Sequence, residues 1–398
     1  MRTQVGIVGA GPAGLVLAHL LHRRGIDSVV LERQSREHVE RRIRAGVLEQ
    51  GTVDLLTTVG LADRLRRERM VHHGLEVLFD GVGHRIPLTE LTGRELTIYG
   101  QHELVKDLVA ARLETGRPLL FEAPAIGCSG LDSGAPVVRF EYGGEGDTLH
   151  CDLIAGCDGF HGVCRPAVPQ PALTEYQRDY PYAWLGILAE APPSSDELIY
   201  AQHERGFALH SMRTPKITRL YLQVAPDEDI AAWPDERVWA ELRTRLARHD
   251  PLWQLTDGPV LDKGITALRS VVTEPMQFGR LFLAGDSAHI VPATGAKGLN
   301  LAVADVSVLA TAIEYWYRTG STELLDAYSR TCLTRVWRVQ HFSWWMTSML
   351  HKAPDGDPFT ARLQRAALRQ LTGSEAAARA FAESYVGPPL TGGPHDAP

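Results

Sequence analysis

Residues 4–14 read QVGIVGAGPAG, and this stretch decides the fold. A short apolar strand ends at Val8, a tight turn covers residues 9–14, and residues 15–24 have helical periodicity. A second apolar strand covers residues 28–31, and Glu32 stands at its end. These features together predict a β-α-β unit that binds a dinucleotide.

Each glycine of the turn has a separate expected task. Gly9 permits the sharp turn, Gly11 lets the backbone approach a pyrophosphate, and Gly14 lets the helix and strand pack closely. The helix N-terminus then faces the phosphates, and Glu32 is placed to accept hydrogen bonds from ribose hydroxyls. NAD and FAD both use this motif, so the motif alone leaves the choice open.

The composition sets the broad class. With 398 residues, 44% hydrophobic and 22% charged, the chain is an ordinary globular protein of two or three domains. A net charge of −7 argues against a nucleic-acid partner, and no apolar run approaches the ~18 residues of a spanning helix. Five cysteines without a C-x-x-C pair indicate reduced thiols and no metal site. We therefore expect a cytoplasmic protein without a membrane partner.

A second motif favours FAD over NAD. Gly285 and Asp286 follow a buried-strand pattern, and residues 294–300 (TGAKGLN) open a long helix. The start of such a helix offers unpaired N–H groups and a positive dipole to an anion. A reduced flavin carries its negative charge at the pyrimidine end of the ring, so this helix start suits it. Asp286 is then expected to bind the ribityl hydroxyls.

These motifs are shared with a known family. The turn at 9–14, residues 42–49 (RIRAGVLE), residues 157–159 (CDG) and the Gly285–Asp286 pair resemble the class A flavoprotein aromatic hydroxylases. Residues 158–162, 289–292 with 294–300, and 342–348 narrow the resemblance to members that act on 4-hydroxybenzoate. The resemblance extends over nearly the whole chain.

The expected fold class is α/β (α+β), with a Rossmann-like β-α-β domain for FAD. Residues 1–174 and 276–298 are expected to form this domain, with helical patterns at about 47–65 and 102–114. Short apolar and aromatic runs between 175 and 275 predict an inserted antiparallel sheet that binds the substrate. Residues 299–386 should be helical, and residues 387–398 should form a flexible tail.

The resemblance implies a defined FAD site. Beyond Gly9, Gly11 and Gly14, its expected members are Glu32, Arg42, Ile43, Arg44, Ala45, Gly46, Val47, Gln101, Asp158, Asp286, Gly298 and Leu299. The guanidinium of Arg44 suits a pyrophosphate because it makes forked contacts with phosphate oxygens. Ala13 replaces a serine that can hydrogen-bond the pyrophosphate, which should weaken FAD binding by up to about 1 kcal/mol.

A surface groove is expected to receive the nicotinamide cofactor, since the chain has one G-x-G-x-x-G only. The resemblance implies that its members are Arg33, Gln34, Arg44, His161 and Arg269. Arginines also stand at positions 36 and 41, so the 33–44 segment is locally basic. A 2′-phosphate favours such cations, so we expect NADPH as the reductant, with NADH as the alternative.

The substrate site is expected on the antiparallel sheet. Ser211 and Arg213 alternate along one strand and share a face, while Met212 between them should point to the other face. The resemblance implies that Ser211, Arg213 and Tyr221 hold a carboxylate, with an arginine able to bind it in a bidentate manner. It further implies a backbone contact to the substrate ring at Ala293, where the family has proline, so this loop should be less preorganised.

The other end of the substrate is expected to meet tyrosines. By resemblance, Tyr200 and Tyr385 hydrogen-bond the substrate phenol and His72 is the outlet of a proton relay. A histidine suits that place because it titrates near neutrality.

The implied reaction hydroxylates 4-hydroxybenzoate to 3,4-dihydroxybenzoate with NADPH and O₂, by way of a flavin hydroperoxide, in a homodimer. Three alternatives stay open: a hydroxylase of an amino- or dihydroxy-benzoate, a flavin-binding redox protein without hydroxylation, and an NAD-dependent dehydrogenase.

Overall fold

The computed structural model describes residues 1–42, 46–353 and 355–390. Strand β1 (Val5–Val8) leads through α1 (Pro12–Arg23) to β2 (Ser28–Leu31), and the two strands pair in parallel from Val5 opposite Ser28. This confirms the β-α-β unit. Its strands are buried along their whole length, as a parallel sheet covered on both faces requires.

Distant segments complete this first sheet, whose six strands lie in the order β18-β19-β12-β1-β2-β8. Strand β12 (Leu153–Gly156) pairs in parallel with β1 on one side and with β19 (Leu281–Leu283) on the other. The chain therefore returns to the first domain near residue 281, as the buried-strand pattern there predicts. The edge strands are β8 (Leu119–Leu120) and β18 (Gln277–Phe278).

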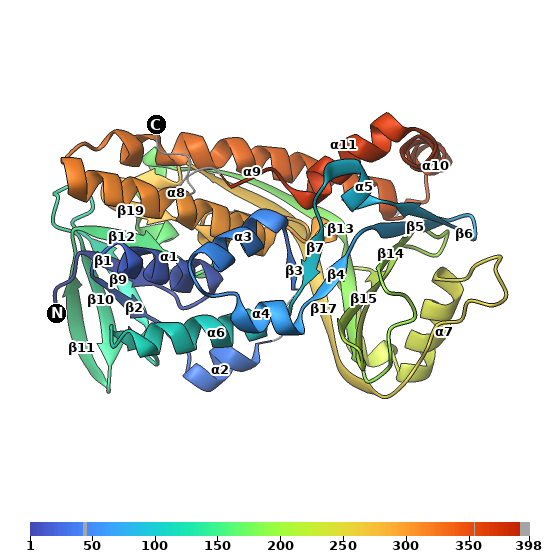
Figure 1. The fold of residues 1–398 in the computed structure, drawn as a ribbon, viewed down its shortest axis with the longest axis horizontal. Helices are drawn as coiled ribbons and strands as arrows, with labels where there is room; N and C mark the ends of the chain where they lie inside the picture. The colour runs from blue at the N-terminus through green and yellow to red at the C-terminus, as the bar shows by residue number, and fades with distance from the viewer. Residues whose placement is uncertain (43–45, 354, 391–398) are drawn as a thin grey trace.

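Long helices pack on this sheet. Helix α1 lies against α6 (Gln101–Glu114) and α8 (Gly298–Thr319), and α8 lies beside α9 (Glu323–Leu350) (Figure 1). Among the described residues, α8 alone is long and apolar enough to cross a membrane. Because 67% of its most apolar window is buried inside the protein, α8 is a core helix. The expectation that no apolar run approaches the length of a spanning helix is therefore corrected at α8.

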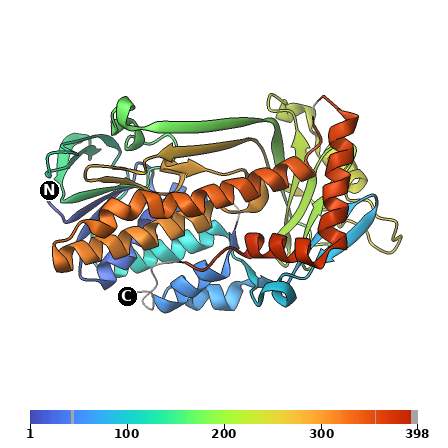
Figure 2. The same cartoon turned by 90° about the horizontal axis from the view of Figure 1, so that it is seen from above.

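A second, eight-stranded sheet has the order β20-β17-β13-β16-β15-β14-β5-β6. Its members are β13 (Thr174–Ala189), β14 (Leu198–Ala201), β15 (Ala208–Thr214), β16 (Ile217–Val224), β17 (Val260–Glu274), β20 (His289–Ile290), β5 (Leu75–Phe79) and β6 (Val82–Ile86). Strands β13 and β17 are long and connect the two halves of the molecule (Figure 2). Strands β13 to β17 pair in antiparallel fashion, as predicted for residues 175–275. However, β14 pairs in parallel with β5, so the sheet is mixed and includes strands from outside that range.

Each face of the second sheet has its own core. One face packs against α7 (Asp235–Arg245), with Trp239 and Leu242 in the same cluster as Leu220 and Leu222. The other face packs against α9, α10 (Pro358–Gly373) and α11 (Glu375–Val386). Figure 1 shows α7 and the α10–α11 pair on opposite sides of the sheet. Helices α8, α9, α10 and α11 form the helical region that was predicted for residues 299–386.

Some expected elements are wrong in detail. The single helix expected at 47–65 is a short strand β3 (Val47–Leu48) followed by α3 (Gln50–Thr58) and α4 (Asp63–Glu68). Gly60, with a φ of 79°, turns the chain between the two helices, and β3 pairs with β7 (Leu96–Ile98). Strand β11 (Glu145–His150) precedes β12 directly in the chain.

The remaining elements lie around the two sheets. They are α2 (Arg36–Arg41), β4 (Met70–His72), α5 (Leu88–Thr92), β9 (Ala125–Ser129) and β10 (Val137–Tyr142). All five cysteines are free, as predicted.

Candidate functional site

The glycine turn after β1 is built for close backbone approach. Gly9 has a φ of 104°, and a Cβ there would lie 2.3 Å from the carbonyl oxygen of Cys157. A Cβ at Gly14 would lie 2.0 Å from the carbonyl oxygen of Gly9, so helix and turn are in contact there. A Cβ at Gly11 would meet nothing within 4 Å, and no side chain caps the N-terminus of α1. The turn therefore presents an open cradle at a helix N-terminus, which fits a pyrophosphate.

Glu32 closes this cradle from the neighbouring strand. Its carboxylate accepts hydrogen bonds from the N–H of Ala10 at 2.8 Å and from the N–H of Gln34 at 2.9 Å. The side chain is 9% exposed. Its position beside the glycine turn fits the role of ribose acceptor.

The second motif is held by a buried ion pair. Gly285, with a φ of 63°, begins a short 3₁₀ turn that contains Asp286 and ends at Ser287. One oxygen of Asp305 accepts from the N–H of Gly285 at 2.9 Å and contacts Nε2 of His289 at 2.7 Å. Burial opposes the charge on His289, but Asp305 outweighs it and raises the His289 pKa. Asp305 thus fixes the backbone that presents Asp286.

The start of α8 is fastened to the first domain. Asn300 accepts from the N–H of Glu49 at 2.9 Å and donates to the carbonyl of Val47 at 3.0 Å. Lys297 is 2% exposed, donates to Glu49 Oε1 at 2.7 Å and also donates to the carbonyl of Tyr385. The helix start containing Gly298 and Leu299 is therefore held beside the 46–49 segment.

The 46–49 segment also meets the start of α6. The N–H of Tyr99 donates to the carbonyl of Gly46 at 2.8 Å, and Val47 pairs with Ile98. Gln101, the first residue of α6, therefore lies near Gly46 and Val47. Of the expected loop at 42–47, positions 43–45 lie outside the described residues.

Two of the residues expected to meet the nicotinamide cofactor, His161 and Arg269, lie against Phe160. The Arg269 guanidinium lies 4.0 Å from the ring centroid of Phe160, and that of Arg165 lies 4.1 Å from it. His161 contacts the same ring edge-on at 5.0 Å. Asp158 turns inward and accepts from the N–H of Cys164 at 2.9 Å, which orders this loop.

Helix α2 is less basic than its sequence indicates. Ion pairs one turn apart join Arg36 to Glu40 at 2.6 Å and Arg41 to Glu37 at 2.8 Å. Arg33 lies exposed just before the helix. A 2′-phosphate would therefore compete with glutamates for two of the arginines in this segment.

The residues expected to form the substrate face lie together on the second sheet. Tyr200, Leu209 and Tyr221 lie directly opposite one another on β14, β15 and β16. Ser211 lies opposite Arg219 in the next row, and side chains two residues apart along a strand share a face. Gly186 on β13 lies opposite Tyr221, where a Cβ would come within 2.6 Å of Nη2 of Arg219.

Arg213 is the central charge of this face. Its Nη1 donates to the carbonyl of Met212 at 2.9 Å and to Oγ of Ser211 at 3.4 Å, and its Nη2 donates to the Tyr221 hydroxyl at 3.4 Å. Nε is buried without a partner, and no carboxylate pairs with this guanidinium in the described part of the chain. Burial lowers the Arg213 pKa.

A second arginine strengthens the positive field. Arg219 lies 5.3 Å from the ring centroid of Tyr221, and its backbone carbonyl accepts from Ser211 Oγ at 2.9 Å. Burial alone would raise the Tyr221 pKa, but Arg213 and Arg219 outweigh it and lower the pKa. The sequence analysis missed Arg219, although its spacing of two from Tyr221 on one strand was a usable signal.

The expected tyrosine pair is present. The hydroxyls of Tyr200 and Tyr385 are 2.6 Å apart, and the Tyr200 hydroxyl also lies 3.2 Å from the carbonyl oxygen of Thr294. Both rings are at most 2% exposed, and burial raises the pKa of both phenols. Because a carbonyl only accepts, a bond from Tyr200 to Thr294 requires Tyr385 to donate to Tyr200.

The other expected residues are placed less directly. His72 ends β4, is 1% exposed, and makes no hydrogen bond through its ring to any described residue. Burial lowers its pKa to about 4. Ala293 is exposed and its carbonyl accepts from the N–H of Ala296 at 2.9 Å. Met212 is buried in the cluster that contains Tyr200 and Tyr385, and its backbone carbonyl accepts from Arg213. The expectation that its side chain points to the other face is therefore wrong, because the strand register shifts between Met212 and Thr214.

The glycine cradle, the acid on β2 and the second turn at Gly285 define a dinucleotide-binding flavoprotein. The chain belongs to the family described as FAD binding domain, whose model matches residues 2–343. It is therefore an FAD-dependent oxidoreductase of the flavoprotein monooxygenase type.

The similarity to named relatives covers nearly the whole chain. The chain is 47% identical, over 98% of its length and 96% of the relative, to p-hydroxybenzoate hydroxylase of Acinetobacter baylyi. It is 26% identical to 3-amino-4-hydroxybenzoate 2-monooxygenase of Streptomyces cremeus, with 91% of each chain covered. Its fold is similar to the solved structure of p-nitrophenol 4-monooxygenase from Pseudomonas putida, with a TM-score of 0.77, 19% identity, and 97% and 99% of the two chains covered.

Proposed function

We propose that this protein hydroxylates 4-hydroxybenzoate at the carbon beside its hydroxyl group. The reaction takes 4-hydroxybenzoate, NADPH, O₂ and a proton to 3,4-dihydroxybenzoate, NADP⁺ and water. Its 47% identity to p-hydroxybenzoate hydroxylase supports this assignment. The observation that carries it is the half-buried Arg213 side chain, whose Nε is enclosed without a partner and whose guanidinium has no carboxylate partner among the described residues.

The Arg213 end of the face suits a substrate carboxylate. A buried charge without a counterion is costly, and a carboxylate ligand would relieve that cost. Ser211 and Tyr221 add hydroxyl groups beside the guanidinium, and Arg219 adds positive charge. This set favours an aromatic acid over a neutral phenol.

The Tyr200 end suits a phenolic hydroxyl. The backbones of Tyr200 and Tyr221 are separated by two strand spacings, about 10 Å. A benzoate with a para hydroxyl group places its two polar groups at opposite ends of the ring, as this separation requires. Tyr200 would donate to the phenolic oxygen after leaving the Thr294 carbonyl, which stabilises the phenolate. The phenolate makes the adjacent ring carbon electron-rich.

The expected cofactor residues fit the same reaction. Glu32, the glycine turn and the Asp286 turn would hold FAD, and Gly46, Val47, Gln101, Gly298 and Leu299 would lie along it. Bound FAD supplies the redox chemistry, taking electrons from a nicotinamide cofactor and activating O₂. The protein's own residues orient the ring, ionise the phenol and exclude water.

The proposed proton path leads from the substrate phenol through Tyr200 and Tyr385. The Tyr200–Tyr385 bond supports its first step. His72 would be its outlet, and its buried ring nitrogens are available to ordered water.

A product assay tests the proposed function. The holoenzyme is supplied with NADPH or NADH and a panel that contains 4-hydroxybenzoate, 4-aminobenzoate and 2,4-dihydroxybenzoate. We expect 3,4-dihydroxybenzoate from 4-hydroxybenzoate and little product from the others. Preferential turnover of 4-aminobenzoate or 2,4-dihydroxybenzoate would assign a different hydroxylase, and cofactor oxidation without product from any of them would indicate a redox protein only.

We also propose that the protein is a homodimer. Trp337 is 42% exposed on α9 and contacts Tyr176, itself 48% exposed, at a ring distance of 5.6 Å. Exposed aromatic pairs are typical of interfaces. Light scattering of the wild type and of Trp337→Glu tests this, with a dimer expected only for the wild type.

A further inference from the structure

His351 directly follows α9 and lies in the core beside the second sheet. Its side chain is 1% exposed and makes two hydrogen bonds. Nδ1 lies 3.0 Å from the carbonyl oxygen of Thr347, and Nε2 lies 2.6 Å from the indole nitrogen of Trp184. The helix end is thereby joined to strand β13.

The two partners fix the state of this imidazole. A carbonyl oxygen only accepts, so Nδ1 of His351 must carry the proton. An indole N–H only donates, so Nε2 must be the unprotonated acceptor. The ring is therefore neutral and in one tautomer, and burial lowers its pKa to about 3.

The indole that His351 holds is a wall of the substrate face. The Trp184 ring lies 4.8 Å from the ring of Tyr221, whose hydroxyl accepts from Arg213. The Trp184 ring also stacks on the Phe207 ring at 5.2 Å, and the Phe207 ring stacks on the His351 ring at 4.5 Å. The indole N–H bond thus sets the angle of the ring that supports the carboxylate clamp.

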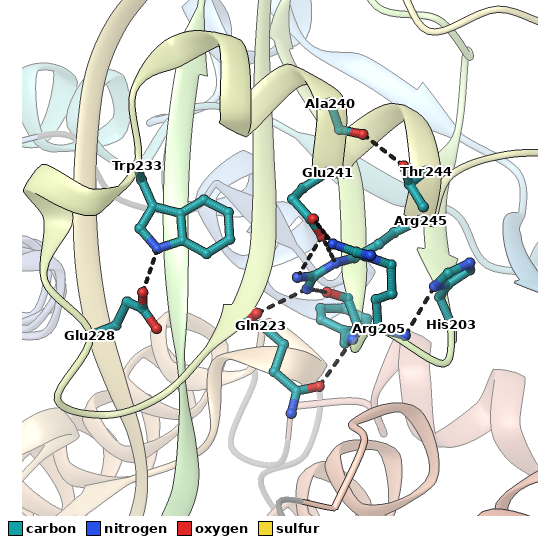
Figure 3. Close-up of polar contacts among 10 residues, drawn as sticks. His203, Arg205, Gln223, Glu228, Trp233, Ala240, Glu241, Thr244 and Arg245 are labelled. Carbon is teal, nitrogen blue, oxygen red and sulfur yellow. Dashed lines mark hydrogen bonds and ion pairs between the residues drawn. The ribbon is translucent and has the colours of Figure 1, made fainter.

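The surrounding frame gives His351 little freedom. Gln223, directly opposite Trp184 across β13 and β16, donates to the carbonyl of Lys352 at 2.8 Å and accepts from its N–H at 3.0 Å. The backbone carbonyl of Gln223 also accepts from Arg245 at 2.9 Å (Figure 3). Gln364 of α10 donates to the carbonyl of His351 at 2.7 Å.

The same turn of α9 reaches the tyrosine end of the site. The hydroxyls of Thr347 and Thr294 are 2.8 Å apart, and the Thr294 carbonyl accepts from Tyr200. The last turn of α9 is therefore linked to Tyr200 through Thr294, and to Tyr221 through Trp184.

We propose that His351 is a positioning residue that sets substrate affinity and ring placement by holding the Trp184 indole against Tyr221. The proposal rests on the proposed function, because it deepens the account of the same substrate site. It predicts that loss of the imidazole loosens the carboxylate end without weakening FAD binding.

Binding of 4-hydroxybenzoate to the FAD-loaded enzyme tests the proposal. His351→Phe keeps the ring stack but removes both hydrogen bonds, whereas His351→Gln retains an acceptor and a donor. We expect the Kd to rise at least tenfold in His351→Phe and less than threefold in His351→Gln. KM should rise more than kcat falls, and FAD affinity should stay at the wild-type value.

Two controls separate positioning from general destabilisation. His84→Phe alters an imidazole stacked on Phe79 at 4.7 Å, outside this network, and should leave Kd unchanged. In a double-mutant cycle, Trp184→Phe and His351→Phe together should raise Kd by less than the product of the two single effects. Multiplicative effects, or a wild-type Kd in His351→Phe, would overturn the proposal.

A substrate-free measurement distinguishes this proposal from the proposed function. The indole N–H resonance of Trp184, assigned through Trp184→Phe, should lie far downfield in the wild type and move upfield in His351→Phe. If the wild type binds no 4-hydroxybenzoate but this shift is seen, the proposed function fails while the His351 contact holds. If the resonance is the same in both proteins, the proposal itself fails.

Discussion

The two sheets of the molecule build their sites from different parts of the chain. In the six-stranded sheet, the cradle is made of backbone at Gly9, Gly11 and Gly14, with Glu32 as its side-chain acid. In the eight-stranded sheet, the candidate site is made of side chains on separate strands, with Arg213 at its centre. The first site needs glycines, whose missing side chains leave room for a ligand. The second site needs side chains that pairing of distant strands brings together.

This difference has an energetic side. Glu32, the one acid of the first site, already accepts hydrogen bonds from two backbone N–H groups. Arg213 is half-buried, with its Nε enclosed without a partner and no paired carboxylate among the described residues. The second sheet therefore gives up stability for binding, which is typical of functional sites.

The largest expected effect breaks the first site. Gly9→Ala places a Cβ against the Cys157 carbonyl at a positive φ, so we expect the free energy of unfolding to fall by at least about 3 kcal/mol. Gly11→Ala is its matched control, because a Cβ there meets open space. It should keep the apoprotein melting temperature but weaken FAD binding at least tenfold. Calorimetry and flavin titration measure both, and equal stability of the two variants would contradict the assigned glycine roles.

The next effect is the loss of stability in acid that three buried histidines cause. Burial lowers the pKa of His72 and His210 to about 4 and of His351 to about 3, against 6.5 for a free histidine. Unfolding therefore takes up protons below pH 6.5, and each histidine lowers stability by up to about 1.4 kcal/mol per pH unit until its folded pKa is reached. Urea unfolding between pH 7 and 5 measures this. His351→Gln should reduce the slope by one proton, and an unchanged slope would show that His351 is not buried neutral.

A smaller effect is expected at Tyr200 and Tyr385, where a substitution should impair hydroxylation but not substrate binding. Tyr200→Phe should still bind FAD and substrate, because the Arg213 end is intact. The bound substrate should lack phenolate absorbance, and the product formed per NADPH should fall at least about tenfold, with hydrogen peroxide made instead. Tyr385→Phe should act in the same direction more mildly, being one hydrogen bond further away. Wild-type coupling in Tyr200→Phe would exclude this pair from proton transfer.

The smallest expected effect concerns the nicotinamide cofactor. We expect a higher kcat/KM for NADPH than for NADH, and Arg33→Ala should narrow the difference. Glu40→Gln should widen it a few-fold, because Arg36 is then released from its ion pair. Steady-state kinetics with both cofactors measures this. Equal use of NADH by the wild type would mean that the ion pairs of α2 cancel its positive charge.

Local sequence was enough to predict the β-α-β unit of the first sheet. Residues 4–32 contain strand, turn, helix and acid in one continuous segment, so periodicity and glycine chemistry predicted β1, α1 and β2. The 15-residue strand β17 and the helix α7 were missed, because β17 is half exposed and its pairing with β13 comes from a distant segment. The helix expected at 47–65 failed because β3 pairs with β7, a long-range contact without a local signal.

Long-range pairing also limited the prediction of the site. The alternation of Ser211 and Arg213 was visible in the sequence, and the structure brings Tyr221 beside them. Trp184 and His351 were not predicted, because they are 167 residues apart and meet only through the fold. His72 shares no hydrogen bond with Tyr385 in the described residues, so the family resemblance alone carries that part of the relay.

The central claim is that Arg213 recognises the carboxylate of the substrate, and a binding titration tests it most directly. We expect the FAD-loaded Arg213→Met variant to lose about 3–5 kcal/mol of affinity for 4-hydroxybenzoate while retaining FAD. Its apoprotein should be at least as stable as the wild type, because a buried charge without a carboxylate has been removed. 4-Hydroxybenzyl alcohol, which lacks the carboxylate, should bind both proteins equally weakly. Near-native affinity of Arg213→Met for 4-hydroxybenzoate would contradict the account.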